Sequence, residues 1–166
     1  MHQGSMRRVG IAARAVVVAL ALAAPVFADA PISGVDQQYE NFDSRDTFIK
    51  DRFTHLVWDR PADPYPAAMT FDAAKVSCPG TMRLPSLKEL LTLVDETPHQ
   101  EYDTTKGVNV ARNIDEPAFR GTPPEDFWTS SSDGTRIWTV DFSDGATRTV
   151  NPGNTVARVR CVDYQP

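Results

Sequence analysis

The sequence has few of the side chains that enzymes and metal sites use most often. Its 166 residues include two cysteines and three histidines, and they contain no G-x-S-x-G, no H-E-x-x-H and no glycine-rich phosphate loop. His2 lies in a segment that we expect to be removed, so a histidine-based metal site would have only His55 and His99. We therefore expect no catalytic residue, no bound metal and no other cofactor.

An excess of positive charge is also missing. The chain has 17 lysines and arginines against 22 aspartates and glutamates, and its basic residues are scattered singly between acids. Such a surface would repel a nucleic-acid backbone, an anionic membrane and a sulfated polyanion. We expect none of these three as a partner.

No hydrophobic run is long enough to span a membrane. The longest, residues 15–24, has about ten residues, whereas a spanning helix needs roughly 20. Three arginines within residues 7–14 precede this run, and Pro25 and small residues follow it, in the order that is typical of a secretory signal peptide. Two A-x-A-like sites place cleavage after Ala28 or after Ala30, and the local pattern does not choose between them.

Export would leave an acidic protein outside the cytoplasm. Removal of residues 1–28 takes away three arginines and no acid, which leaves 14 basic against 22 acidic side chains, a net charge of −8. A membrane anchor is the alternative, but the apolar run is short, and no cysteine near the cleavage sites offers lipid attachment. We expect a secreted or periplasmic protein, with Met1 or Met6 as its native start, a polar leader at 29–46 and one domain at 47–166.

The two cysteines, Cys78 and Cys161, would then meet an oxidising compartment, in which an even pair usually closes. We predict a Cys78–Cys161 disulfide across a separation of 83 residues. On the chain-entropy model, such a loop stabilises the fold by about 4–5 kcal/mol at most. Two free buried thiols are the alternative.

Strand and helix signals alternate through the first half of the domain. Residues 48–58 contain two short strand patterns around a turn at Asp51-Arg52, and three prolines within residues 61–66 indicate a connector. Thr70 opens a short helix with apolar residues on one face. Ser86 and Glu89 form a capping box for a second helix, predicted to end near Glu96. Its core-facing stripe is Leu87, Leu90, Leu91 and Val94.

The second half is predicted to contain a long loop followed by strands. Residues 99–126 have little periodicity and much proline, glycine and charge, so we expect a long irregular loop region. Period-two patterns at 128–131, 136–142, 146–150 and 156–162 then predict an antiparallel β meander of four strands. Asp133-Gly134 and Asp144-Gly145 supply hairpin turns. Two helices and such a meander make an α+β fold.

Five motifs of the domain, in this order, resemble those of one bacterial family. They are DRFTHLVW at residues 51–58, MRLPSLKEL at 82–90, FWTSS at 127–131, IWTVDFSDG at 137–145 and VRCV at 159–162. On these motifs, the chain resembles the Lcl C-terminal domain family, which takes its name from a collagen-like adhesin and has many members with no assigned function. The resemblance implies a C-type-lectin-like fold, related to that of the formylglycine-generating enzymes.

Two positions depart from the family's motifs. His55 stands where the family has glycine, and Met82 stands where it has tryptophan. Histidine tolerates a left-handed turn better than most side chains, and methionine fills part of a tryptophan-sized space. The motif arginines, Arg83 and Arg160, are expected to hold buried carboxylates such as that of Glu89.

The resemblance also bears on chemistry. Formylglycine-generating enzymes use a reactive cysteine pair, but Cys78 and Cys161 match the family's structural bridge. Calcium-dependent lectins use Glu-Pro-Asn or Gln-Pro-Asp, whereas this chain has Glu116-Pro117-Ala118. We therefore expect a non-catalytic binding module that recognises a glycan or a surface protein, as in adhesion, through the long loop and the adjoining sheet face.

The candidate ligand-binding residues lie in that loop and on the outward strand faces. They are Tyr102, Asn109, Arg112, Asn113, Arg120, Arg136 and Arg148. Each is more often a solvated surface residue. The alternatives are a structural subunit or cap of a cell-surface assembly and, less favoured, an enzyme of the formylglycine-generating type; the oligomeric state stays open.

Overall fold

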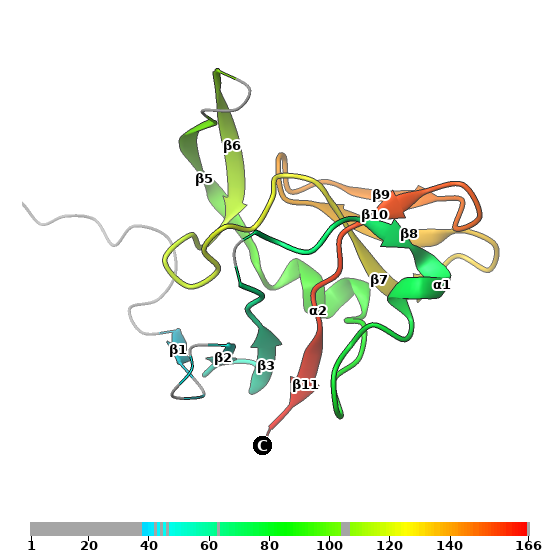
Figure 1. Cartoon of the computed structure of the whole chain (residues 1–166), viewed down its shortest axis with the longest axis horizontal. Coiled ribbons are helices and arrows are strands. Elements are labelled where there is room, and N and C mark those ends of the chain that lie inside the picture. Colours follow the sequence, from blue (N-terminus) through cyan, green and yellow to red (C-terminus); the bar gives the residue numbers. More distant parts are fainter. Residues whose placement is uncertain are drawn as a thin grey trace, which may run out of the picture. The chain divides into compact units, whose positions relative to one another are not determined.

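The computed structural model describes residues 38–41, 43, 45, 47–62, 64–103 and 107–165 (Figure 1). The predicted signal peptide, its two cleavage sites and most of the polar leader lie outside the described residues. Within the described part of the chain, no helix is long and apolar enough to cross a membrane.

A four-stranded antiparallel sheet joins the start of the described chain to its end. Its order is β1 (Tyr39–Asn41), β2 (Phe48–Asp51), β3 (Leu56–Asp59) and β11 (Val162–Tyr164). The predicted strand pair within 48–58 is therefore confirmed. His55, in the turn between β2 and β3, has a φ of 58°, so it adopts the left-handed conformation that its motif position requires.

The two predicted helices are present, but both are short. α1 (Phe71–Ala74) follows β4 (Met69–Thr70), and the Thr70 hydroxyl accepts a hydrogen bond from the Ala73 amide. α2 (Leu87–Leu91) begins at the predicted capping box of Ser86 and Glu89. The starts of both helices are thus confirmed.

The predicted end of the second helix near Glu96 is wrong. The chain leaves the helix at Thr92, because Leu93 turns inward and is buried, and Val94 already belongs to a strand. Leu91, placed in the core-facing stripe, is 36% exposed, whereas Leu90 is fully buried. The apolar residues therefore keep a helical spacing as far as Val94, although the helix itself ends at Leu91.

The long irregular loop predicted at 99–126 is also wrong over its first part. β5 (Val94–Asp103) and β6 (Val108–Ile114) form an antiparallel ribbon that pairs with no other described strand (Figure 1). Most side chains of β5 and the first two of β6 are outside the core, so the sequence carries no apolar alternation to reveal these strands. Residues 115–125 are turns and irregular chain, as predicted.

The predicted four-stranded meander has three strands. β7 (Asp126–Ser132), β8 (Ile137–Asp141) and β9 (Thr147–Val150) form one antiparallel sheet. The fourth segment is divided: β10 (Val156–Ala157) pairs with β4, and β11 pairs with β3. Between them, Arg158 exchanges backbone hydrogen bonds with Asp126 and Trp128, so this segment bridges three different sheets.

The predicted disulfide is confirmed. The Cys78 and Cys161 sulfur atoms are 2.09 Å apart, and the Cα atoms are 5.6 Å apart. The bond links the chain after α1 to the segment before β11. It therefore fixes the end of the described chain to its helical part.

Two clusters of buried side chains form the core. The larger packs the first sheet and α2 against β7 and β8, with Trp58, Leu90, Phe119, Phe127 and Phe142 among its members. The smaller surrounds α1 and β10 and contains Ala74, Leu84, Trp128, Ile137 and Ala157. The described part of the chain is thus mostly antiparallel β in small sheets, with two short helices.

Candidate functional site

The seven predicted ligand-binding residues do not converge on one site. Tyr102 and Asn109 come together as a cross-strand pair of the β5–β6 ribbon, and both are exposed. The Tyr102 side chain is 60% exposed, and Arg120 lies exposed in the turn after Phe119. Of these three residues, Tyr102 and Asn109 therefore share a surface defined by strand pairing.

Arg112 and Asn113 have structural partners instead. The Arg112 guanidinium lies 2.7 Å from a Glu101 carboxylate oxygen and donates to the Thr122 carbonyl at 2.6 Å. The buried Asn113 amide group donates to the Asp95 carbonyl at 3.1 Å. These contacts attach β6 to its surroundings.

Arg136 and Arg148 lie on the three-stranded sheet. The Arg136 guanidinium donates to the Thr149 carbonyl of β9. Arg148 lies 2.9 Å from Asp141, 2.6 Å from Asp144 and 3.5 Å from Asp126. Arg136 thus contacts β9, and Arg148 contacts β7, β8 and the turn after β8. The positive charge of Arg148 neutralises part of the charge of these three aspartates.

The two motif arginines differ in their partners. Arg83 forms a two-pronged ion pair with Glu89, at 2.7 and 2.9 Å, as predicted. Arg160 is buried, but it donates to the Asp59 carbonyl at 2.6 Å and to the Thr122 hydroxyl at 2.7 Å rather than to a carboxylate. Both arginines stabilise the fold.

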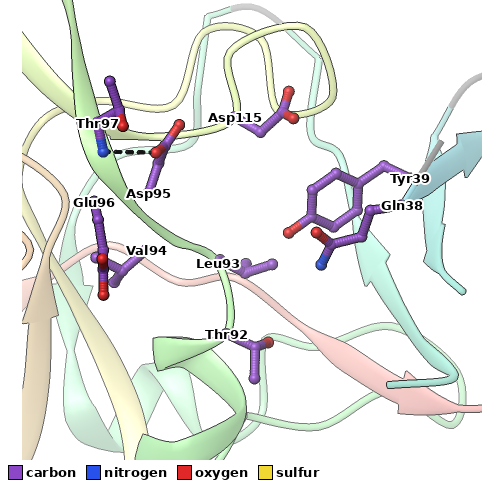
Figure 2. A pocket seen from close by; sticks show the side chains of 9 residues that line it. All are labelled: Gln38, Tyr39, Thr92, Leu93, Val94, Asp95, Glu96, Thr97 and Asp115. Atoms are coloured by element: carbon purple, nitrogen blue, oxygen red, sulfur yellow. Dashed lines mark hydrogen bonds between the residues drawn. The ribbon is translucent and has the colours of Figure 1, made fainter. Parts of the chain in front are cut away.

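A pocket with a cavity volume of about 270 Å³ lies where β1 faces the junction of α2 and β5. We call it the Tyr39 pocket. Figure 2 shows its side chains around a common space, with Gln38 and Tyr39 opposite the segment 92–97. The lining residues are Gln38, Tyr39, Thr92, Leu93, Val94, Asp95, Glu96, Thr97 and Asp115.

Tyr39 forms one wall of this pocket. Its ring packs edge-on against Phe119, with ring centroids 5.0 Å apart. Burial raises the pKa of the Tyr39 hydroxyl, and the negative charges of Asp51, Asp115 and Asp95 raise it further. The hydroxyl is therefore neutral and sits in a negative electrostatic field.

Two aspartates lining the pocket are held by backbone amides. Asp95 Oδ1 accepts a hydrogen bond from the Thr97 amide at 2.7 Å, and Asp115 Oδ1 accepts one from the Ala118 amide at 2.9 Å (Figure 2 shows the first). These bonds fix the carboxylates in place. The pocket therefore offers preorganised acceptors on a partly apolar wall.

The sequence did not point to this pocket. The sequence pattern places residues 92–96 in a helix, Tyr39 in the polar leader and Asp115 in the long loop region. The one available signal was the acidic run Asp95-Glu96 next to Thr97, directly after a well-defined helix. The acidic segment faces Tyr39 across the pocket because strands that are distant in the sequence pair with each other.

A second hollow of similar volume lies near the disulfide. It is lined by Phe48, Val57, Pro79, Gly80, Thr81, Met82, Asp163 and Gln165. The one carboxylate among its described lining residues, that of Asp163, already accepts a hydrogen bond from the Thr81 hydroxyl at 2.6 Å. This hollow offers mainly apolar contacts.

The part of the chain that the structure describes contains no cluster of three or more His, Cys, Asp or Glu side chains suited to a metal ion. Asp141 and Asp144, the carboxylates nearest to such a site in the sequence, accept hydrogen bonds from the turn amides of Ser143 and Ala146. Asp141, at the end of β8, and Asp144, in the predicted hairpin turn, therefore both stabilise the turn between β8 and β9.

These features define a disulfide-linked, mostly β domain with a small acidic pocket. Comparison with known families agrees with the motifs: the Lcl C-terminal domain matches residues 47–163. The chain belongs to this family. No curated protein and no solved structure matches the chain.

Proposed function

We propose that the chain is an exported, non-catalytic binding module that holds a sugar residue of a surface glycan in the Tyr39 pocket. The observation that carries this proposal is the pocket itself, which combines an aromatic wall with carboxylate, amide and hydroxyl groups. Sugar hydroxyls need several such acceptors and donors at fixed positions, and a sugar ring packs against an aromatic side chain.

The position of the pocket supports recognition of a longer ligand. Segment 94–97 of the pocket belongs to β5, the strand whose far end carries the exposed Tyr102 and its partner Asn109. A glycan bound in the pocket can continue along this ribbon. The C-type-lectin-like fold that the family resemblance implies agrees with such a role, although fold alone does not determine a ligand.

A glycan array probed with the labelled full chain tests this proposal. We expect binding to at least one class of surface glycan, and weaker binding by the Asp115→Asn variant. Asp72→Asn is the matched control, because it removes the same charge from an exposed carboxylate of α1 that does not line the pocket. Absence of binding to every glycan would contradict the proposal.

Whether the β5–β6 ribbon contacts the ligand is tested by a separate variant. Tyr102→Ala removes an exposed ring and is expected to leave the melting temperature unchanged, because surface substitutions usually change stability by less than about 0.5 kcal/mol. Reduced binding on the array would support a ribbon contact. Unchanged binding would restrict the site to the Tyr39 pocket.

A further inference from the structure

We infer that the Tyr39 pocket selects sugars that carry a free primary ammonium group, as in a non-acetylated amino sugar. This inference rests on the proposed function and specifies its ligand. It is carried by three properties of the pocket: the sign of its charges, an unsatisfied buried carboxylate oxygen, and its volume.

The charged residues that line the pocket are all acidic. Asp95, Glu96 and Asp115 contribute carboxylates, and no lysine or arginine is among the described residues that line the pocket. Behind the pocket, Asp51 accepts a hydrogen bond from the Gln38 amide group at 3.2 Å. Together these groups give the space a negative potential, which favours a cationic ligand.

The positive groups near the pocket do not cancel this potential. Arg160 opposes the field of the aspartates at Tyr39, but its effect on the Tyr39 pKa is weaker than that of Asp51, Asp115 or Asp95. His99 Nε2 lies 3.4 Å from Asp95 Oδ2 and is charged only when protonated. A cation in the pocket would therefore add a favourable contact.

Asp95 is the residue that most needs a further donor. Its side chain is only 9% exposed, and its Oδ1 atom accepts from the Thr97 amide. Its Oδ2 atom makes no hydrogen bond within the described residues, and His99 Nε2, 3.4 Å away, offers it a charge only when protonated. A buried carboxylate oxygen without a donor is costly. An ammonium group has three N–H donors, so one group can serve Asp95 and a neighbouring acceptor together.

The volume restricts what can enter. A cavity of about 270 Å³ lies below the roughly 300–1,000 Å³ of sites for drug-sized ligands, so it accommodates one sugar residue and not a longer segment. An N-acetyl group would remove the positive charge and add bulk. A carboxylate or sulfate on the sugar would be repelled by the aspartates.

Calorimetric titration of the full chain with two trisaccharides tests the inference. The probes are the β-1,4-linked glucosamine trimer, at a pH where its amines are protonated, and the fully N-acetylated trimer of the same backbone. We expect the glucosamine trimer to bind at least about tenfold more tightly, since its ammonium forms charge-assisted hydrogen bonds.

Isosteric variants locate the selectivity. Asp95→Asn and Asp115→Asn retain the oxygen that accepts the Thr97 or Ala118 amide, but each removes a negative charge. Each is expected to reduce the preference for the glucosamine trimer by at least about fivefold. The control Asp72→Asn should leave the preference unchanged. Thermal unfolding of every variant verifies that it folds. The two pocket variants test the inference independently of each other.

Five outcomes would overturn the inference in distinguishable ways. Equal affinity for the two trimers, or a preference that survives in both pocket variants, removes the ammonium selectivity and leaves glycan binding intact. Binding of other array glycans with no binding of either trimer does the same. Failure of all glycans removes the proposed function itself. If Nα-acetyl-lysine methylamide competes with the glucosamine trimer at equal affinity, the pocket recognises an ammonium group as found on a protein lysine, and the proposed sugar ligand is wrong.

Discussion

Glu89 connects a family motif to the start of a helix. Its carboxylate accepts hydrogen bonds from the Arg83 guanidinium and from the Ser86 amide at 2.7 Å. The hydrogen bond from Arg83, followed by that from the Ser86 amide, lowers the pKa of Glu89 to about 2. The motif sequence M-R-L-P-S-L-K-E-L therefore specifies an ion pair and a helix cap together.

This pKa makes part of the stability dependent on pH. Because the folded-state pKa is lower than the unfolded value of 4.5, Glu89 stabilises the fold fully above pH 4.5, and the contribution is lost as pH falls towards 2. Glu89→Gln should destabilise the protein near pH 6 and have a smaller effect near pH 3. Urea unfolding at the two pH values measures this; equal effects at both would contradict the assignment.

His55 stands where the motif of the family has glycine, and its backbone conformation makes the effect of this difference testable. It adopts a φ of 58°, where a residue with a side chain is strained by roughly 1–2 kcal/mol relative to glycine. His55→Gly is therefore expected to raise the free energy of unfolding by about 0.5–1 kcal/mol, after allowance for the greater entropy of unfolded glycine. His55→Val should lower it. Chemical denaturation of both variants checks the opposite signs.

At the scale of elements, α2 gives a matched pair of leucines. Leu90 is fully buried in the larger core cluster, and its neighbour Leu91 is 36% exposed. Leu90→Ala should cost about 2–5 kcal/mol of stability. Leu91→Ala should cost clearly less, because more than a third of the Leu91 surface is already exposed to water in the folded protein. Similar losses for both variants would show that the helical stripe predicted from sequence extends through Leu91.

Strongly local signals in the sequence predicted their elements correctly. The capping box at Ser86, the turn before Leu56 and the glycine of Asp144-Gly145 each determine structure within a few residues, and each is confirmed. The disulfide was predictable for a different reason: an even pair of cysteines usually closes in an oxidising compartment, and two cysteines allow only one pairing.

Elements stabilised by distant partners were not predictable. The ribbon of β5 and β6 places few side chains in the core, so its strands leave no apolar period in the sequence. The last segment looked like one strand because Ala157, Val159 and Cys161 alternate, yet its backbone pairs with three sheets. The Tyr39 pocket was missed for the same reason, because it forms between segments far apart in the chain.

At the scale of the whole molecule, the disulfide joins the C-terminal segment to the chain after α1. Replacing Cys78 and Cys161 together by serine should lower the free energy of unfolding by about 2–5 kcal/mol, since the unfolded chain loses a cross-link spanning 83 residues. Thermal unfolding with and without a reductant measures the effect. A double variant as stable as the oxidised protein would contradict this role.

The whole molecule also combines net negative charge with a pocket of the same sign. The chain carries a formal net charge of −5, and the pocket's own charges are three carboxylates. Long-range attraction and local recognition would therefore favour the same cationic ligands. Export, which we propose from the N-terminal sequence, would place this module where surface glycans occur.

Nuclear magnetic resonance mapping of the bound glycan tests most directly whether the Tyr39 pocket binds a sugar residue. The ¹⁵N-labelled full chain is titrated with the glycan that binds most strongly on the array, and the shifted backbone amides are assigned. We expect the largest shifts at Tyr39, in segment 92–97 and at Asp115. Shifts confined to the hollow around Thr81 and Met82, or no saturable shifts, would contradict it.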